Sequence, residues 1–203
     1  MRKATPKKLI TVLALAMLVV AAFAAQASAK PKDNNSNGIP DAWEKAHQIS
    51  TKKDRGNRDA DADGASNRCE YQAKTDPNVA DTDANGTVDG DEDTDGDGAT
   101  NRAESNLHSN CGRANSHLRI RRATVTSFVD GTLVLTVRGG GTVTAPVSSS
   151  LRCSTKKAKS KPVATASKGK KPAACTTEDL VAGTSVHKAR IKSGKFVELT
   201  LIK

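Results

Sequence analysis

The sequence predicts two parts of different fold class: an extended array of loops and short helices with little regular structure, followed by a small all-β, barrel-like domain. Residues 33–104 repeat one oxygen-rich motif four times, and apolar and polar residues alternate from Ala123 onward. The charge also divides the chain. Residues 30–117 hold 11 Lys and Arg against 18 Asp and Glu, a net charge of −7, whereas residues 118–203 hold 17 against 4, a net charge of +13.

The repeated motif places Asp or Asn at positions 1, 3 and 5, Gly at 6, Asp or Asn at 9 and Glu at 12. Calcium takes six to eight oxygen ligands, and alternate side chains on a tightly turning loop supply them, with the last Glu binding through both oxygens. Glycine at position 6 allows the turn because it adopts positive φ without strain. The motif therefore predicts calcium as the bound ion. The candidate ligands are Asp33, Asn35, Asn37, Asp41 and Glu44 in loop 1; Asp59, Asp61, Asp63, Asn67 and Glu70 in loop 2; Asp81, Asp83, Asn85, Asp89 and Glu92 in loop 3; and Asp93, Asp95, Asp97, Asn101 and Glu104 in loop 4.

Helix capping is an alternative reading of positions 9 and 12. Asp or Asn followed three residues later by Glu resembles a capping box, and residues 42–46, 68–74 and 102–104 are predicted short helices. Both roles are compatible. Capping does not explain positions 1, 3 and 5, where neighbouring like charges would repel each other without a cation.

The acidic half has few residues from which to build an apolar core. Its larger apolar side chains are Ile39, Trp43, Ile49, Tyr71, Val79, Val88 and Leu107. So polar a segment normally stays disordered, and we therefore expect its folding to depend on bound metal. Chelation should unfold this half and leave the β-domain folded.

Two phrases of this half, residues 33–44 and 75–86, resemble bacterial thrombospondin type 3 repeats. The resemblance covers residues 33–104. It implies extended, disulfide-supported calcium arrays of secreted or cell-surface proteins. A loop followed by a short helix also resembles a dockerin, which docks a protein partner. Paired EF-hands fit less well, because they lack an entering helix here and only Val88 is apolar at position 8.

The basic half reads as a β-meander with tight turns and a closing hairpin. The predicted strands are 123–129, 132–137, 142–145, 185–191 and 196–202. Residues 119–203 resemble the small OB-like β-barrels of bacterial secreted proteins. Five or six such strands would make a small barrel.

A Lys-rich loop, residues 154–174, interrupts the strands without any apolar period. Its lysines are Lys156, Lys157, Lys159, Lys161, Lys168, Lys170 and Lys171. Such a loop is either simply solvated or binds an anionic polymer of the cell wall by neutralising its charges. Nucleic acid is disfavoured as a partner, because base stacking needs aromatic side chains and only Phe128 and Phe196 are candidates, both expected in the core.

The first 29 residues read as a secretory signal. Basic residues precede an apolar run from Leu9 to Ala25, and Ala27-Ser28-Ala29 fits a cleavage site. The exported chain would begin at Lys30 and carry no membrane span. An uncleaved membrane anchor is the alternative.

The four cysteines all lie in the exported part, which suits an oxidising compartment. Three pairings are possible. We favour Cys69 with Cys111 and Cys153 with Cys175, because each pair then stays within one compositional region.

The sequence thus predicts a secreted, non-catalytic calcium-binding protein that is extracellular or associated with the cell wall. Calcium would rigidify a repeat array that presents an interaction module. The alternatives are a dockerin-like module with a protein partner and a polyanion binder acting through the basic half. An enzyme is disfavoured, because no nucleophile–base pair, histidine metal site or phosphate loop is found.

Overall fold

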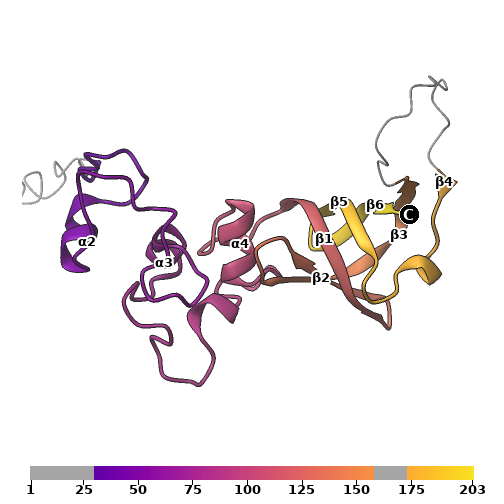
Figure 1. Ribbon diagram of the computed structural model, residues 1–203, viewed down its shortest axis with the longest axis horizontal. Coiled ribbons are helices and arrows are strands. Elements are labelled where there is room, and N and C mark those ends of the chain that lie inside the picture. Colours follow the sequence, from indigo (N-terminus) through magenta and orange to yellow (C-terminus); the bar gives the residue numbers. More distant parts are fainter. Residues whose placement is uncertain (1–29, 158–172) are drawn as a thin grey trace, which may run out of the picture. The chain divides into compact units, whose positions relative to one another are not determined.

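The repeat region is built from loops joined by a few very short helices (Figure 1). The computed structural model describes residues 30–157 and 173–203, so the predicted signal (1–29) and Lys159, Lys161, Lys168, Lys170 and Lys171 lie outside the described residues. The helices are α2 (Asp41–Ala46), α3 (Asn67–Ala73), η1 (Asp89–Asp91) and α4 (Asn101–Leu107). Three of them follow loops 1, 2 and 4, as predicted. The expected fold class of this half is confirmed.

Helices α3 and α4 begin and end in the same way. Ser66 and Thr100, both at position 8 of their loops, accept hydrogen bonds from the amides of Cys69 and Ala103. Such caps satisfy amides that the first turn leaves without partners. Both helices end at a residue with left-handed φ, Lys74 and His108, so each remains seven residues long.

The second half is a closed five-stranded barrel with a two-residue extra strand, β4. The strands are β1 (His117–Val129), β2 (Thr132–Val137), β3 (Thr142–Lys156), β4 (Ala173–Ala174), β5 (Ser185–Lys192) and β6 (Lys195–Ile202), with the short helix η2 (Thr177–Asp179) before β5. The sheet runs β2-β1-β5-β6-β3-β4, and a further β2–β3 pairing closes it. Only β3 and β6 pair in parallel. The expected OB-like barrel is confirmed as a fold.

Strands β1 and β3 are longer than predicted because each pairs with more than one strand along its length. In β1, residues 123–129 pair with β2 and residues 117–124 with β5. In β3, residues 142–146 pair with β2, whereas residues 152–156 pair with β6. The added segments are rich in Arg, Ser and Thr, and long-range pairing rather than local propensity places them in the sheet.

The barrel has the main apolar core. Its fully buried side chains include Phe196, Ile120 and Leu135, and Ala99 and Ala103 from loop 4 belong to the same cluster. Residues 33–203 accordingly form one compact unit. No helix within the described residues has the length and apolar character to cross a membrane.

The repeats have a much smaller cluster, made of Ala65, Cys69 and Cys111. The disulfides join Cys69 to Cys111 and Cys153 to Cys175, which is the pairing favoured from the sequence. A cluster of this size buries too little apolar surface to fold the loops on its own. The polar groups of the loops must therefore supply much of the organisation.

Candidate metal centre

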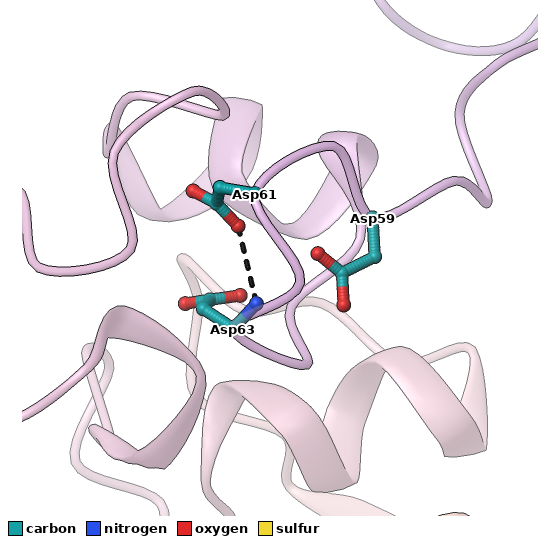
Figure 2. A group of neighbouring side chains, drawn as sticks. All are labelled: Asp59, Asp61 and Asp63. Atoms are coloured by element: carbon teal, nitrogen blue, oxygen red, sulfur yellow. Dashed lines mark hydrogen bonds between the residues drawn. The ribbon is translucent and has the colours of Figure 1, made fainter.

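Loop 2 gathers three carboxylates on one turn (Figure 2). The Asp59 carboxylate accepts the amides of Ala62 and Gly64, at 2.7 and 2.9 Å. Asp61 accepts the amide of Asp63 at 3.2 Å, and Asp63 accepts that of Ala65 at 2.7 Å. These bonds bend the backbone inward, so that oxygens of all three aspartates lie within 4.8 Å of one another.

Loop 4 repeats this arrangement. Asp93 accepts the amides of Gly96 and Gly98, each within 2.9 Å, and Asp97 accepts that of Ala99 at 3.0 Å. Oxygens of Asp93, Asp95 and Asp97 also lie within 4.8 Å of one another. The same motif therefore produces the same convergence of carboxylates twice.

Both loops also bury oxygens that have no hydrogen-bond partner, at the same three motif positions. At positions 3, 9 and 12 these are Asp61 Oδ2, Asn67 Oδ1 and both Glu70 carboxylate oxygens in loop 2, and Asp95 Oδ2, Asn101 Oδ1 and Glu104 Oε2 in loop 4. Glu70 and Glu104 are 0% exposed. Burying such oxygens without a partner costs free energy. A hard cation such as calcium takes this donor set.

The electrostatics of the two glutamates agree with this reading. Desolvation by burial, reinforced by the charges of Asp61 and Asp63, raises the pKa of Glu70 to about 9. Desolvation, together with the charges of Asp95 and Asp97, likewise raises the pKa of Glu104 to about 9. Each loop thus places more negative charge in a buried space than it can hold without a proton or a cation.

The pKa of the aspartate at position 3 is also raised in both loops. Desolvation is the main cause that raises the pKa of Asp61 and of Asp95 to about 6. Desolvation also raises the pKa of Asp63.

Loop 1 satisfies its position-12 carboxylate internally. Glu44 accepts hydrogen bonds from the side-chain amides of Asn35, at 2.9 and 3.2 Å, and Asn37, at 2.7 Å. Asp41 accepts the amide of Asn34 at 2.9 Å. Among the described residues, loop 1 forms no group of three carboxylates like those of loops 2 and 4.

Loop 3 is similar to loop 1 in this respect. Glu92 accepts the side-chain amide of Asn85 at 2.6 Å, and Asp81 accepts the amides of Asn85 and Gly86. Asp89 does not lie with Asp81 and Asp83 in a group; its carboxylate lies instead beside those of Asp63 and Glu70. The ligand assignments in all four loops remain predictions.

The sequence analysis missed Asn115, which lies beyond the last motif. Its side-chain amide donates to Glu104 Oε1 at 2.7 Å and to Asp97 Oδ2 at 3.1 Å. Asn115 thereby fixes two candidate ligands of loop 4 in the way that outer hydrogen bonds orient metal ligands. Nothing in the local sequence marks Asn115, because it lies 11 residues after Glu104 and outside the repeated motif.

Two arginines that connect a loop to an earlier loop were not predicted from the sequence. Arg68, at position 10 of loop 2, donates to the Asn37 carbonyl of loop 1 at 2.7 Å. Arg102, at position 10 of loop 4, donates to the Asp63 carbonyl of loop 2. Each arginine thus contacts the position-5 carbonyl of an earlier loop. The recurring Asn-Arg pair at positions 9 and 10 was the available signal.

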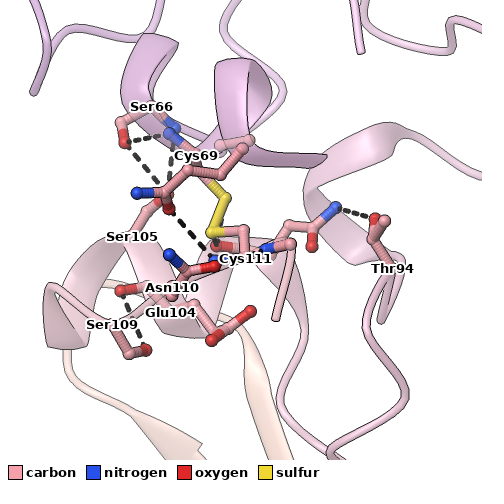
Figure 3. Close-up of a disulfide and its surroundings, with 12 residues drawn as sticks. Ser66, Cys69, Thr94, Glu104, Ser105, Ser109, Asn110 and Cys111 are labelled. Atoms are coloured by element: carbon pink, nitrogen blue, oxygen red, sulfur yellow. Dashed lines mark hydrogen bonds between the residues drawn. A yellow bond between two sulfur atoms is a disulfide. The ribbon is translucent and has the colours of Figure 1, made fainter. Parts of the chain in front are cut away.

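The disulfide of the repeats joins Cys69 to Cys111, close to Ser66, Ser105 and Asn110 (Figure 3). Cys69 is in α3, one residue before Glu70, and Cys111 follows α4. Ser66 and Ser105 of the same region are joined by a hydroxyl hydrogen bond of 3.2 Å. The disulfide therefore links the helix that carries Glu70 to the chain that follows Glu104.

The barrel carries a basic face that the strand pattern alone could have revealed. Arg119 of β1 is paired with Arg190 of β5, and Arg121 with Lys188. Glu198 forms ion pairs with both Lys188 and Arg190. Like charges directly opposite each other cost stability in a sheet. Of the predicted polyanion-binding lysines, Lys156 and Lys157 are described, and both are exposed.

A family model described as Bacterial TSP3 repeat matches residues 59–80 and 93–110, whereas no curated protein and no solved structure matches the chain. The two matched segments begin at position 1 of loops 2 and 4, the loops whose buried oxygens lack partners. Such repeats are structural and bind calcium, and together with the two disulfides they indicate an extracellular protein. Loops 2 and 4 are therefore the two segments of this chain that match the bacterial TSP3 repeat.

Proposed function

We propose that this is a secreted, non-catalytic calcium-binding protein in which loops 2 and 4 are the principal calcium sites. The observation that carries the proposal is the recurrence of buried, unpartnered oxygens at positions 3, 9 and 12 of both loops. Asp59, Asp61, Asp63, Asn67 and Glu70 would hold one ion, and Asp93, Asp95, Asp97, Asn101 and Glu104 the other. Calcium supplies positive charge and several oxygen contacts at once.

The proposed role of the bound ions is mechanical. Glu70 and Glu104 come from helices α3 and α4, so binding through them fixes each helix against its own loop. Arg68 hydrogen-bonds to loop 1 and Arg102 to loop 2, so that order in loops 2 and 4 also restrains these earlier loops. The result is a rigid repeat array joined to the barrel, which serves as the interaction module.

This role is favoured over dockerin-like partner capture because helix α4 already packs inside the molecule. In α4, Ala103 is fully buried in the barrel core and Glu104 faces its own loop. Asn106 is the one exposed residue of α4. A helix buried to this extent presents little surface to a protein partner.

Calcium titration of the full chain by calorimetry tests the proposal. We expect at least two saturable sites, and we expect the double substitution Glu70→Gln and Glu104→Gln to remove both. Gln keeps the size of Glu but loses the charge and the bidentate carboxylate. Glu178→Gln is the matched control, since Glu178 lies in η2 of the barrel domain. Equal heats and stoichiometry in the double variant and in wild type would refute the assignment.

Polyanion binding through the basic half is the second candidate function. The specific observation that favours it is the cross-strand pairing of Arg119 with Arg190 and of Arg121 with Lys188. Such a face loses stability unless counterions or an anionic ligand neutralise it. The exposed Lys156 and Lys157 extend the positive charge to the start of the Lys-rich loop. An anionic polymer of the cell wall fits this charge pattern.

A further inference from the structure

We propose that Asp89, which the motif assigns to loop 3, is a ligand of the loop 2 calcium ion, so that this site is built from two successive repeats. The inference rests on the proposed calcium binding of loop 2 and adds a ligand and a coupling to it. It follows from a buried group of three carboxylates that crosses the boundary between the loops.

The group consists of Asp63, Glu70 and Asp89, whose oxygens lie within 4.8 Å of one another. These residues are 3%, 0% and 1% exposed. Both carboxylate oxygens of Glu70 are buried without a hydrogen-bond partner. The Glu70 oxygens between the three residues are therefore acceptors without a donor. Burying them costs free energy, and a bound cation would remove this cost.

Several bonds hold Asp89 in this position. The amide of Gly90 donates to Asp63 Oδ2 at 2.6 Å, and the side-chain amide of Asn101 donates to the Asp89 carbonyl at 2.7 Å. The amide and hydroxyl of Thr82 donate to the Asp89 carboxylate at 3.0 and 2.6 Å. Asp89 is thus held beside loop 2 by hydrogen bonds at its carboxylate, at its backbone carbonyl and at the amide of the next residue, Gly90.

Gly90 shows how close this approach is. A Cβ atom at this position would clash with the backbone carbonyl of Asp63 and press on the amide of Ala65. Only glycine lets the two chains come so near. The sequence provides it directly after Asp89.

No cationic side chain in the described part of the chain forms an ion pair with Asp63, Glu70 or Asp89. Arg102 lies nearby, but it donates to the Asp63 carbonyl and pairs with Asp91 instead. Three buried carboxylates without a cationic partner repel one another. A divalent ion shared by loop 2 and Asp89 removes that repulsion.

The structural consequence is a direct link between loops 2 and 3. An ion held by Asp63, Glu70 and Asp89 ties η1, which begins at Asp89, to loop 2 and α3, across 26 residues from Asp63 to Asp89. Loop 3 then retains Asp81, Asp83, Asn85 and Glu92 for an ion of its own. Loading of loop 2 should accordingly order the start of loop 3.

Site-resolved NMR of the full chain during calcium titration tests this inference. The amides of Gly64, Gly86 and Gly98 report loops 2, 3 and 4 separately. Asp89→Asn should raise the calcium concentration that half-saturates the Gly64 signal by about tenfold, because ligand charge is a main lever on affinity. The Gly98 signal should titrate as in wild type.

Two control variants separate ligation from local damage. Asp83→Asn removes a loop 3 carboxylate outside the group and should move only the Gly86 titration. Thr82→Val removes the hydroxyl bonded to Asp89 but keeps the Asp89 carboxylate and the Thr82 amide bond, and should shift the Gly64 titration much less than Asp89→Asn does. The inference is overturned if Asp89→Asn affects only Gly86, or if Thr82→Val weakens loop 2 as much as Asp89→Asn does. A wild-type chain whose Gly64 and Gly98 amides ignore calcium would instead overturn the proposed function itself.

Discussion

The amide of Thr144, in β3 of the barrel, donates to the carbonyl of Gly98, at position 6 of loop 4, with an N–O distance of 2.6 Å. The amide of Thr100 in turn donates to the carbonyl of Thr142 at 3.0 Å, and an isolated bridge pairs Ala99 with Val143. Loop 4 therefore continues the hydrogen bonding of the barrel edge. Order in the calcium loop and order in β3 are physically connected.

We predict that calcium removal loosens this edge of the barrel while the rest of the barrel stays folded. Hydrogen exchange of the full chain should show a loss of protection at the Thr144 amide in metal-free buffer. The amide of Leu199, buried in β6, should keep its protection, because its strand pairs with β3 and β5 rather than with loop 4. Unchanged exchange at Thr144 would mean that loop 4 keeps its shape without an ion. Loss of protection at Leu199 would mean that the barrel needs the ion as a whole.

The metal-free protein should become less stable as the pH rises. Glu70 and Glu104 have a pKa raised from 4.5 to about 9 in the folded state. Between these values the folded chain holds protons that the unfolded chain releases, so the free energy of unfolding falls with increasing pH. Thermal unfolding in metal-free buffer at about pH 5.5 and about pH 8.5 should show the drop, and the Glu70→Gln, Glu104→Gln double variant should show much less of it.

Calcium binding should have the opposite pH dependence. The ligands must lose their protons before they bind a cation, so binding releases protons and the apparent affinity rises with pH. Calorimetry in two buffers of different ionisation enthalpy measures this release. A proton count of zero at about pH 7 would contradict the protonated state expected for Glu70 and Glu104.

The fold was largely predictable because its signals are local. The Gly at position 6 of each loop and the apolar–polar alternation in strands such as Thr132–Val137 can be recognised in the sequence without knowing which segments pair. The extensions of β1 to His117 and of β3 to Lys156 were missed, since their pairing with β5 and β6 is set by residues distant in the sequence.

The candidate site was predictable only within each loop. Positions 1, 3 and 5 of loops 2 and 4 converge as the motif predicts. Contacts such as Arg102 with Asp63 and Asn115 with Glu104 depend on how the chain packs around the loops, and of these two only the Arg102 contact has a sequence signal, the recurring Asn-Arg pair. The motif also gives Asn37 and Asp63 the same position, although Asn37 donates to a carboxylate and Asp63 does not.

We predict that loop 1 fills last. Its three carboxylates are fewer than the four of loop 2 or of loop 4, and Glu44 is already satisfied by the amides of Asn35 and Asn37. Asn37→Asp should tighten calcium binding at loop 1 by about tenfold, because it removes a competing donor and adds a ligand charge. The Gly38 amide reports loop 1 in NMR titration. Saturation of Gly38 before Gly64 and Gly98 in wild type would contradict the order.

Arg68→Ala and Arg102→Ala should each destabilise the calcium-saturated chain by about 1–3 kcal/mol, since each leaves a carbonyl without its charged donor. The affected carbonyls are those of Asn37 and Asp63. Arg58→Ala serves as the control because Arg58 is an exposed arginine of the same region. Chemical denaturation in saturating calcium gives the free energies. Equal losses of unfolding free energy in all three variants would show that the hydrogen bonds of Arg68 and Arg102 to the earlier loops do not stabilise the protein.

The Lys-rich loop and the basic face of the barrel offer separate sources of polyanion affinity. We predict that binding to purified anionic wall polymer resides mainly in the loop and weakens steeply with salt, because exposed lysines act through charge neutralisation. The loop variant replaces with serine the seven lysines Lys156, Lys157, Lys159, Lys161, Lys168, Lys170 and Lys171. The face variant replaces Arg119 and Arg121 with serine.

The loop variant should lose binding while keeping the calcium stoichiometry of wild type, since the ligands of loops 2 and 4 lie in the acidic half. The face variant should lose less, because Glu198 already neutralises part of the charge of Lys188 and Arg190 on that face. A log–log plot of affinity against salt should have a slope of a few units in wild type and a smaller slope in the loop variant. If the face variant loses more than the loop variant, the arginines of β1 are the binding surface. If wild type binds no polymer at low salt, the lysines only solvate the loop, and the barrel's partner is not a polyanion.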